Sequence, residues 1–457
     1  MTVLILEPAM RVAEGSRPLR RTYRQLRVGA AIAALLSGTA IAGHDVMLNG
    51  GDEPLIEFAS DKPVDADHHL TGSLSIGARL EVKTETEIDF DLDAQTNEDT
   101  LVTRPHLEVA LAYEPSARFR AYTELELSRE LILKDPDTKD AEIQLELKQA
   151  YVALRDIVDG VTLTLGRQYM GDEREWLLDE ELDGAELILR SDGLALELSY
   201  GREGIVRRDL LMDEEETQPD YFIARGFAAV GEDSQASAFA LYQDGHEGKS
   251  DEDLLFLGVQ SFGDLGNHVD FWADGAAVFG EAQGREVRGF GFDVGVTKTF
   301  KELPMRPYLT AGAAFGSGDD GSGNDTAFRQ SGLHGNSDRF GGVTSLHYYG
   351  EVLDPELSNL AILTLGAGIR PTPRSSVDLV YHRYRQHRRE DDLRDVSIDA
   401  DPDGRSRHIG DEIDLIIGIK EIGNIDLELV GGAFMPGRAF EDRDPALFGG
   451  ITVQFKF

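Results

Sequence analysis

The sequence predicts an all-β fold, a transmembrane antiparallel β-barrel of about 18 strands in a bacterial outer membrane. Three observations predict it. From residue 71 to the C-terminus, segments of alternating apolar and polar residues follow one another, separated by residues that favour turns. The chain begins with a segment typical of an export signal, and its 457 residues include no cysteine. An exported protein of this size without disulfides must obtain its stability from a large sheet or core.

The N-terminal segment 1–42 has the composition of a signal peptide. Six arginines precede an apolar run at 28–41, and Ala40-Ile41-Ala42 matches the small residues of a signal-peptidase site. The apolar run is shorter than the roughly 20 residues that a membrane-spanning helix requires. We therefore expect cleavage after Ala42, a short periplasmic segment at 43–70, and a barrel at 71–457.

The number of strands follows from the short turns. Eight segments carry tight-turn residues, and longer, acidic connections alternate with them: 114–116, 159–160, 191–193, 231–234, 264–267, 302–304, 371–373 and 421–424. Both termini of such a barrel lie on the side of the short turns, so eight turns imply about nine hairpins and 18 strands. We expect strands to begin near residues 71, 101, 117, 143, 161, 182, 194, 220, 235, 252, 267, 287, 305, 361, 375, 411, 425 and 447.

Two strands show the alternation clearly. At 194–200, Leu and Tyr alternate with Ala, Glu and Ser. The last strand, at 447–457, places Ile, Val and Phe on one face and Thr, Gln and Lys on the other, and it ends at Phe457. A charged second face is favourable only where it meets water, and a closed sheet of this size leaves an aqueous channel. A soluble sandwich would bury one face and use shorter strands.

Two connections are long, at 317–360 and 386–410. Long barrel loops can fold into the lumen and set its bore, or they can cover the outer mouth, and both remain open here. In the second loop, the aspartates at 399–404 imitate the start of a calcium loop, but Gly410 stands where the twelfth-position Glu is needed. We interpret this match as chance rather than as loop-bound Ca²⁺, and expect no cofactor.

The charge and the motifs limit the function. The formal net charge is −39, which excludes nucleic acid as a partner. Acidic runs at 213–216 and 390–392 indicate a solvated surface, with divalent bridges to lipopolysaccharide as the alternative. The chain has no G-x-S-x-G or H-E-x-x-H motif and no phosphate loop, so we expect neither an enzyme nor nucleotide-driven transport. A hydrolase built from scattered Ser, His and Asp is the minor alternative.

Several segments resemble the alginate export family of outer-membrane porins. The most specific are Gly341-Gly342-Val343-Thr344, His347-Tyr348-Tyr349-Gly350-Glu351, Asp354-Pro355-Glu356-Leu357-Ser358-Asn359-Leu360 and the strand Val377 to Gln386. Leu165-Gly166-Arg167-Gln168, Phe328-Arg329-Gln330 and Arg339-Phe340 resemble the family as well. The resemblance covers most of the chain after the signal peptide. It implies an eighteen-stranded, monomeric porin with an arginine-lined lumen that passes the polyuronate alginate from the periplasm to the exterior.

Arginines are the expected substrate path, because they stay ionised and bind carboxylates with a planar fork. The resemblance points to Arg167, Arg329, Arg339, Arg383 and Arg385 as the lumen constriction. Strand alternation alone adds Arg79, Arg104 and Arg120. A channel that only attracts would trap a polyanion, so acidic residues are also expected there, and Glu130 and Asp183 are candidates. For each arginine, a structural role is an equal alternative to a role in the substrate path: the side chain would form an ion pair that stabilises the barrel wall.

The strand from Ser375 allows two orientations. If Val377, Leu379 and Tyr381 faced lipid, Arg383 and Arg385 would face it too, and burial of each at the membrane midplane would cost about 2–4 kcal/mol. We therefore expect the opposite orientation, in which Val380, His382 and Tyr384 face outward and Tyr384 joins the outer aromatic belt.

The expected function is passive export of an anionic, alginate-like polysaccharide. Two alternatives stay open: a general or small-anion porin on the same barrel, and a plugged barrel with a structural role at the cell surface. The expected partners are the polysaccharide, outer-membrane lipid and lipopolysaccharide, and periplasmic secretion proteins that deliver the polymer.

Overall fold

The computed structural model describes residues 63–96, 99–134, 143–211, 219–231, 233–245 and 252–457. The expected signal peptide at 1–42 and most of the expected periplasmic segment at 43–70 lie outside these residues and stay predictions. In the described part of the chain, no helix has both the length and the apolar composition needed to cross a membrane.

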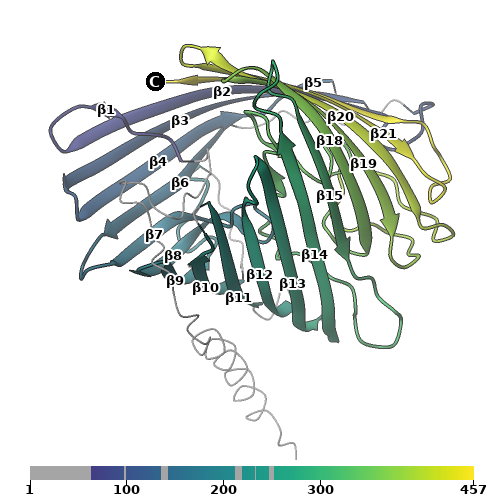
Figure 1. Cartoon of the computed structure of the whole chain (residues 1–457), viewed down its shortest axis with the longest axis horizontal. Helices are drawn as coiled ribbons and strands as arrows, with labels where there is room; N and C mark the ends of the chain where they lie inside the picture. The colour runs from purple at the N-terminus through teal and green to yellow at the C-terminus, as the bar shows by residue number, and fades with distance from the viewer. Residues whose placement is uncertain (1–62, 97–98, 135–142, 212–218, 232, 246–251) are drawn as a thin grey trace, which may run out of the picture. The chain divides into compact units, whose positions relative to one another are not determined.

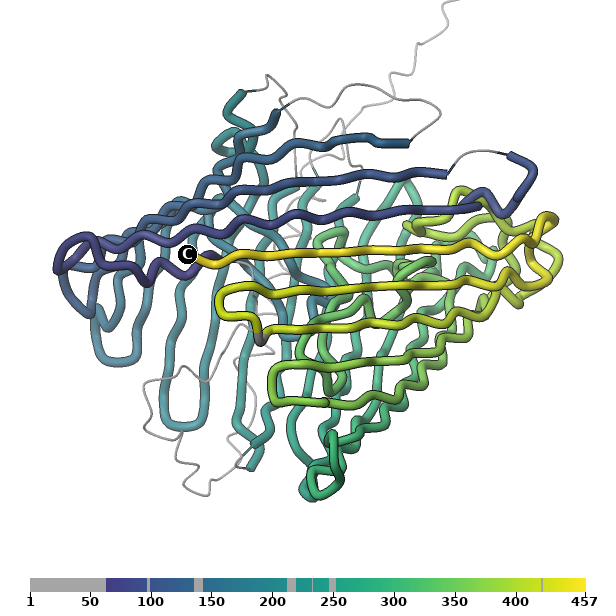
Figure 2. The backbone as a smooth tube through the Cα atoms, turned by 90° about the horizontal axis from the view of Figure 1, so that it is seen from above, coloured from purple at the N-terminus to yellow at the C-terminus, as the bar shows by residue number. Residues whose placement is uncertain are grey.

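The described chain forms a closed antiparallel β-barrel (Figures 1 and 2). Its sheet has 20 strands, but β1 (His68–His69) only pairs with the start of β2 and β5 (Leu131–Lys134) continues β4, so 18 strands build the wall. Pairing of the first wall strand with the last closes the barrel, and Figure 2 shows these two strands side by side. This confirms the predicted fold class.

The wall strands follow one another in chain order. They are β2 (Leu74–Ile88), β3 (Thr100–Ser116), β4 (Phe119–Arg129), β6 (Ile143–Leu154), β7 (Val161–Gly171), β8 (Asp179–Ser191), β9 (Leu194–Arg202), β10 (Asp220–Ala229), β11 (Ser234–Asp244), β12 (Glu252–Asp264), β13 (Val269–Ala282), β14 (Arg285–Thr299), β15 (Tyr308–Gly316), β18 (Leu360–Thr372), β19 (Ser375–Gln386), β20 (His408–Ile422), β21 (Ile425–Pro436) and β22 (Ala446–Lys456). The predicted starts lie within about three residues of these. The turn residues predicted the strand starts well because each short turn joins two strands directly.

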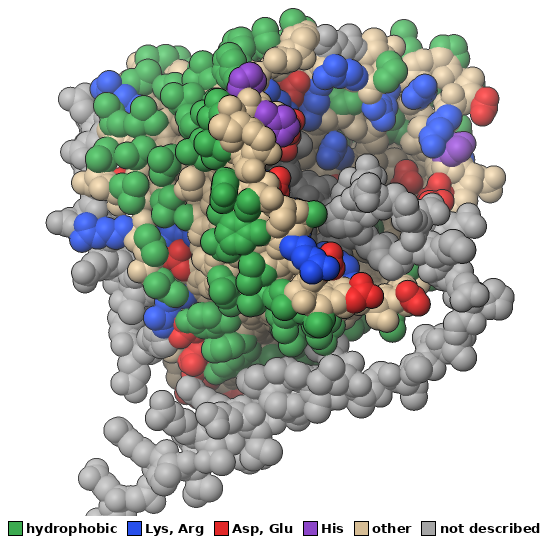
Figure 3. Space-filling model, turned by 90° about the vertical axis from the view of Figure 1, so that its left-hand side faces the viewer, with side chains coloured by type: hydrophobic (Ala, Val, Ile, Leu, Met, Phe, Trp, Pro, Cys, Tyr) green, Lys and Arg blue, Asp and Glu red, His purple; other side chains and the backbone are tan. Residues whose placement is uncertain are grey.

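Side chains alternate between a lipid face and a lumen face. On the lipid face, Leu363, Leu379 and Ile413 are exposed, whereas inward groups such as Glu197 and Asp293 are buried. Figure 3 shows a broad hydrophobic surface on the left of one side of the molecule, with Lys and Arg gathered at its upper right. The barrel thus has the apolar outer band that lipid requires and a polar interior.

The expected orientation of β19 is wrong. Arg383 and Arg385 lie on the exposed outer face, while Val380, His382 and Tyr384 are buried inside the barrel. Tyr384 donates a hydrogen bond to the carbonyl of Tyr349 at 2.6 Å rather than lying in an outer aromatic belt. The two arginines escape the midplane cost because they occupy the extracellular end of the strand.

The long connection 317–359 folds into the lumen and carries much of the buried apolar core. It contains the short strands β16 (Ser337–Asp338) and β17 (Leu346–His347), which pair with each other. The N–H groups of Val352 and Leu353 donate to the carboxylate of Glu412 on β20, at 2.7 and 3.1 Å. Of the two placements left open for this loop, the structure therefore shows the one inside the barrel.

The second long connection, 387–407, packs on the first. The N–H of Ser397 donates to the carbonyl of Leu353 at 3.0 Å, and the N–H of Glu356 donates to the carbonyl of Asp395 at the same distance. Ile398 is buried in the same core. The two loops therefore form one packed unit within the mouth of the barrel on the side of the long connections.

Candidate functional site

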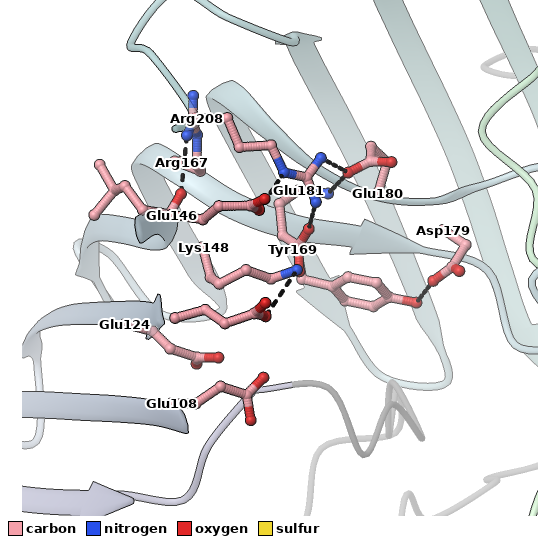
Figure 4. A network of polar contacts seen from close by, with 12 residues as sticks. Glu108, Glu124, Glu146, Lys148, Arg167, Tyr169, Asp179, Glu180, Glu181 and Arg208 are labelled. Carbon is pink, nitrogen blue, oxygen red and sulfur yellow. Dashed lines mark hydrogen bonds and ion pairs between the residues drawn. The ribbon is translucent and has the colours of Figure 1, made fainter. Parts of the chain in front are cut away.

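A charged cavity of about 330 Å³ lies on the lumen side of strands β2, β3 and β6 to β8. Three cations, four carboxylates and one phenol line it: Arg79, Glu108, Lys148, Tyr169, Asp179, Glu180, Glu181 and Arg208. Figure 4 shows Lys148, Arg208 and Glu181 of this lining reaching toward one another. The cavity is the best candidate for a solute path among the described residues, because polar side chains rather than packed apolar ones line it.

Arg208 reaches the cavity because its loop completes the wall. Strands β6 and β7 pair only between residues 150–154 and 163–167. Beyond that point, the loop after β9 pairs with β6: the N–H of Leu147 donates to the carbonyl of Arg208, and the N–H of Leu210 donates to that of Leu145. An interior strand edge without partners would be costly, so the inserted segment satisfies it.

The guanidinium of Arg208 contacts three carboxylates. Its nitrogens lie 3.1 Å from Glu146, 2.8 Å from Glu180 and 3.1 Å from Glu181 (Figure 4). The ammonium of Lys148 lies between Glu126 at 3.9 Å and Glu181 at 3.5 Å. Neither cation is therefore a bare positive charge.

Arg79 and Tyr169 complete the lining. Arg79 on β2 is the cross-strand neighbour of Glu108 on β3 and donates to it at 2.8 Å. Tyr169 donates its hydroxyl hydrogen to Asp179 at 2.8 Å (Figure 4). Each cation of the cavity thus contacts a carboxylate, and an incoming carboxylate would have to exchange places with a wall carboxylate.

The first described residues of the chain lie beside this cavity. The N–H of Val64 donates to the Glu124 carboxylate at 3.0 Å, and the Tyr122 hydroxyl donates to the Val64 carbonyl at 2.8 Å. Glu124 points into the lumen near Glu108 (Figure 4). Residues 63–67 therefore lie inside the barrel and narrow the path.

Arg167 and Asp183 lie in the wall and pair with each other. Two parallel hydrogen bonds join them, at 2.9 and 2.7 Å, and both side chains are buried. Arg167 also donates to the carbonyl of Leu147 at 2.9 Å, and Asp183 accepts the N–H of Val206 at the same distance. This pair holds the inserted loop against β6, which is the bracing role that the sequence left as an alternative.

The remaining candidates inside the barrel are also paired, with one exception. Arg104 contacts Glu85 at 2.6 Å and Glu130 at 2.7 Å, which assigns the predicted Glu130 to this pair. Arg120 lies 3.6 Å from Glu114, and Arg329 lies 3.0 Å from Glu252.

The exception is Arg339, whose guanidinium has no ion pair among the described residues. It is exposed beside a second cavity of about 330 Å³ that Trp272 and Phe340 help to line.

Sequence reasoning missed Lys148, Arg208 and the carboxylates around them. A β-bulge between β4 and β6 hides the inward orientation of Lys148 from strict alternation. Arg208 lies in a connection between strands, where no periodicity marks it. The adjacent acids Glu180 and Glu181 were the one signal of this cavity in the sequence, because two neighbouring carboxylates at the start of a strand favour a cation nearby.

In the described residues, no three His, Asp or Glu side chains are arranged to hold a metal ion. The calcium-like spacing at 399–404 stays a sequence observation. A closed barrel with short turns at one end, inward loops and a charged lumen defines the class of outer-membrane porins.

Solved porins support this class. OpdK of Pseudomonas aeruginosa matches with a TM-score of 0.54 and 11% identity over 84% of this chain and 99% of its own. OccD3 (OpdP) of the same species matches with a TM-score of 0.54 and 12% identity over 87% and 95%.

Within that class, the protein belongs to the alginate export family, whose model matches residues 73–454. It is 28% identical over 187 residues to alginate production protein AlgE of Pseudomonas aeruginosa, covering 36% of this chain and 37% of that one. It is 34% identical over 116 residues to AlgE of Azotobacter vinelandii, covering 23% and 24%. The matched regions thus span well under half of these relatives. Family and fold are those of transport porins in the outer membrane.

Proposed function

We propose that this barrel exports an anionic polysaccharide, an alginate-like polyuronate, by passive passage through its lumen. The observation that carries the proposal is the cavity at β2 to β8, into which Arg79, Lys148 and Arg208 project from the wall. The family membership supports the choice of polymer, and so does the similarity to the alginate production protein AlgE of two species.

The pairing of each cation with a carboxylate suits transport better than storage. A carboxylate of the polymer can replace a wall carboxylate on Lys148 or Arg208, and the displaced group then competes for the cation again. Binding at each step is therefore weak and reversible, and a chain with one carboxylate per sugar can advance by successive exchanges. An arginine set without carboxylates would hold the polymer instead.

The outside of the tight-turn end fits the entry of a polyanion. Lys301, Arg306 and Arg374 are exposed in short turns at this end of the barrel. A protein with a net charge of −39 repels a polyanion on most of its surface, so these cations give it a point of approach. We propose that a monomeric barrel receives the polymer here from periplasmic secretion proteins.

The test is single-channel conductance of the purified protein in a planar bilayer, with titration of oligomannuronate. We expect current that the oligomer blocks, and a block about tenfold weaker in Lys148→Gln/Arg208→Gln, because the exchange cations are gone. The matched control is Arg383→Gln/Arg385→Gln, which removes the same charge from the outer face and should leave the block unchanged.

Two other outcomes would assign the barrel differently. Current that ignores the oligomer but responds to a monomeric uronate would support a small-anion porin, which the modest cavity of about 330 Å³ makes the second candidate. A correctly folded barrel without current, with or without added oligomer, would indicate a plugged surface barrel, since loop 317–359 already fills part of the lumen.

A further inference from the structure

The lipid face of β19 carries two arginines where a membrane protein ordinarily carries apolar residues. From the short-turn end outward, the exposed face of the strand presents Val377, Leu379 and Tyr381, followed by Arg383 and Arg385. That order matches the chemistry of a membrane from its hydrocarbon to its headgroups. Arg385 is the last residue but one of the strand.

Neighbouring strands place Arg385 at the level of the membrane interface. Ala361 on β18 pairs with Arg385 on one side and with Phe315 of β15 on the other. Phe315 packs on Phe290 and Phe292 with ring centroids 5.7 Å apart. Clusters of exposed aromatic rings mark the boundary between lipid tails and headgroups.

The protein supplies little negative charge to this pair. The nearest carboxylate, Asp411 on β20, is 3.8 Å from Arg383. It also lies 3.4 Å from His408 and accepts the hydroxyl hydrogen of Tyr381. Within the described residues, Arg385 has no ion-pair partner. The guanidinium of Arg383 also lies 3.5 Å from Nε2 of His408, but its side chain is 56% exposed and leaves room for a further partner.

The apolar surroundings make an external partner necessary. Leu363 on β18 is the cross-strand neighbour of Arg383, and Leu379 and Ile413 continue the same exposed face. A guanidinium beside lipid tails reaches for the nearest polar layer and pairs there with an anion. On the outer leaflet of an outer membrane, those anions are the phosphates of lipopolysaccharide.

We propose that Arg383 and Arg385, at the extracellular end of β19, form a binding site for the phosphate groups of lipopolysaccharide. The planar fork of each guanidinium matches a phosphate with two parallel hydrogen bonds. Two such forks on one strand face, two residues apart, can hold a bisphosphorylated headgroup against the wall. The site is separate from the lumen and does not rest on the transport proposal.

The experiment measures the lipid A retained by the whole protein in nanodiscs. Wild type and Arg383→Gln/Arg385→Gln are titrated with labelled bisphosphorylated lipid A, and lipid A without phosphates serves as the second ligand. We expect the double variant to bind the bisphosphorylated lipid about tenfold more weakly, because two charge-assisted contacts are lost. Lipid A without phosphates should bind the wild type as weakly as the variant binds the complete lipid.

The matched control is Arg306→Gln/Arg374→Gln, which removes two exposed arginines from the opposite end of the barrel and should bind lipid A like the wild type. Equal binding by the wild type and the β19 variant would overturn the proposal. If the β19 variant fails to fold, the proposal is tested with the wild type alone, by comparing its affinity for lipid A with and without phosphates. Equal affinity for the two lipids would exclude a phosphate site. Block of conductance by oligomannuronate is measured in parallel, so failure here is distinguishable from failure of the export proposal.

Discussion

At the scale of single residues, the buried ion pair of Arg167 and Asp183 has a structural role in the wall. Replacing Arg167 with Ala leaves Asp183 buried without its cation and removes the donor to the carbonyls of Leu147 on β6 and Val206 in the loop. We expect a loss of about 3–5 kcal/mol in the free energy of unfolding, measured by guanidinium titration in liposomes. Arg383→Ala, on the exposed face, should change it by less than about 1 kcal/mol. Equal stability of the two variants would contradict the bracing role.

Residue chemistry alone could not orient β19. Both of its faces are partly apolar, since Val377 and Leu379 lie on one and Val380 and Tyr384 on the other. The inner face is apolar because loop 317–359 packs against it, and a filled lumen resembles lipid in composition. The sequence therefore placed Arg383 and Arg385 on the wrong face of the strand.

At the scale of elements, the strands were predictable and the loops were not. Each short turn carries Gly, Pro, Asn or Asp between two alternating segments, so the local sequence specifies the hairpin. Loop 317–359 has no period, because its side chains pack against inward groups from several distant strands. Its burial could be seen only after the barrel enclosed it.

The carboxylate of Glu412 is one of the groups that connect that loop to the wall. In Glu412→Gln, the amide nitrogen cannot accept, so one of the N–H groups of Val352 and Leu353 loses its partner. We expect loop docking to weaken by about 1–3 kcal/mol, with faster hydrogen exchange at both amides. Glu441→Gln, at a 73% exposed carboxylate, is the control. Unchanged exchange at residues 352 and 353 would show that Glu412 does not hold the loop.

At the scale of the whole molecule, two groups in loop 317–359 make the packing of that loop in the lumen depend on pH. Burial raises the pKa of Glu356 to about 7, although Arg394 opposes the shift from 3.4 Å. Burial lowers the pKa of His347, but the Asp354 carboxylate at 2.6 Å outweighs it and raises the pKa to about 9. Both values exceed those of the unfolded chain, about 4.3 for Glu and 6.5 for His.

A raised pKa means that the folded state holds its proton more tightly than the unfolded one. The stability that each group contributes is therefore complete below its unfolded pKa and is lost as the pH rises through about 7 for Glu356 and about 9 for His347. The backbone hydrogen bonds between the wall strands do not titrate, so the barrel should stay closed while the loop loosens. Hydrogen exchange in residues 341–357, corrected for intrinsic rate, should increase between about pH 4 and 10, with channel conductance rising in parallel. Glu356→Gln should remove the lower step and His347→Gln the upper one. Protection that stays constant across this range in wild type would mean that neither group governs how the loop fills the lumen.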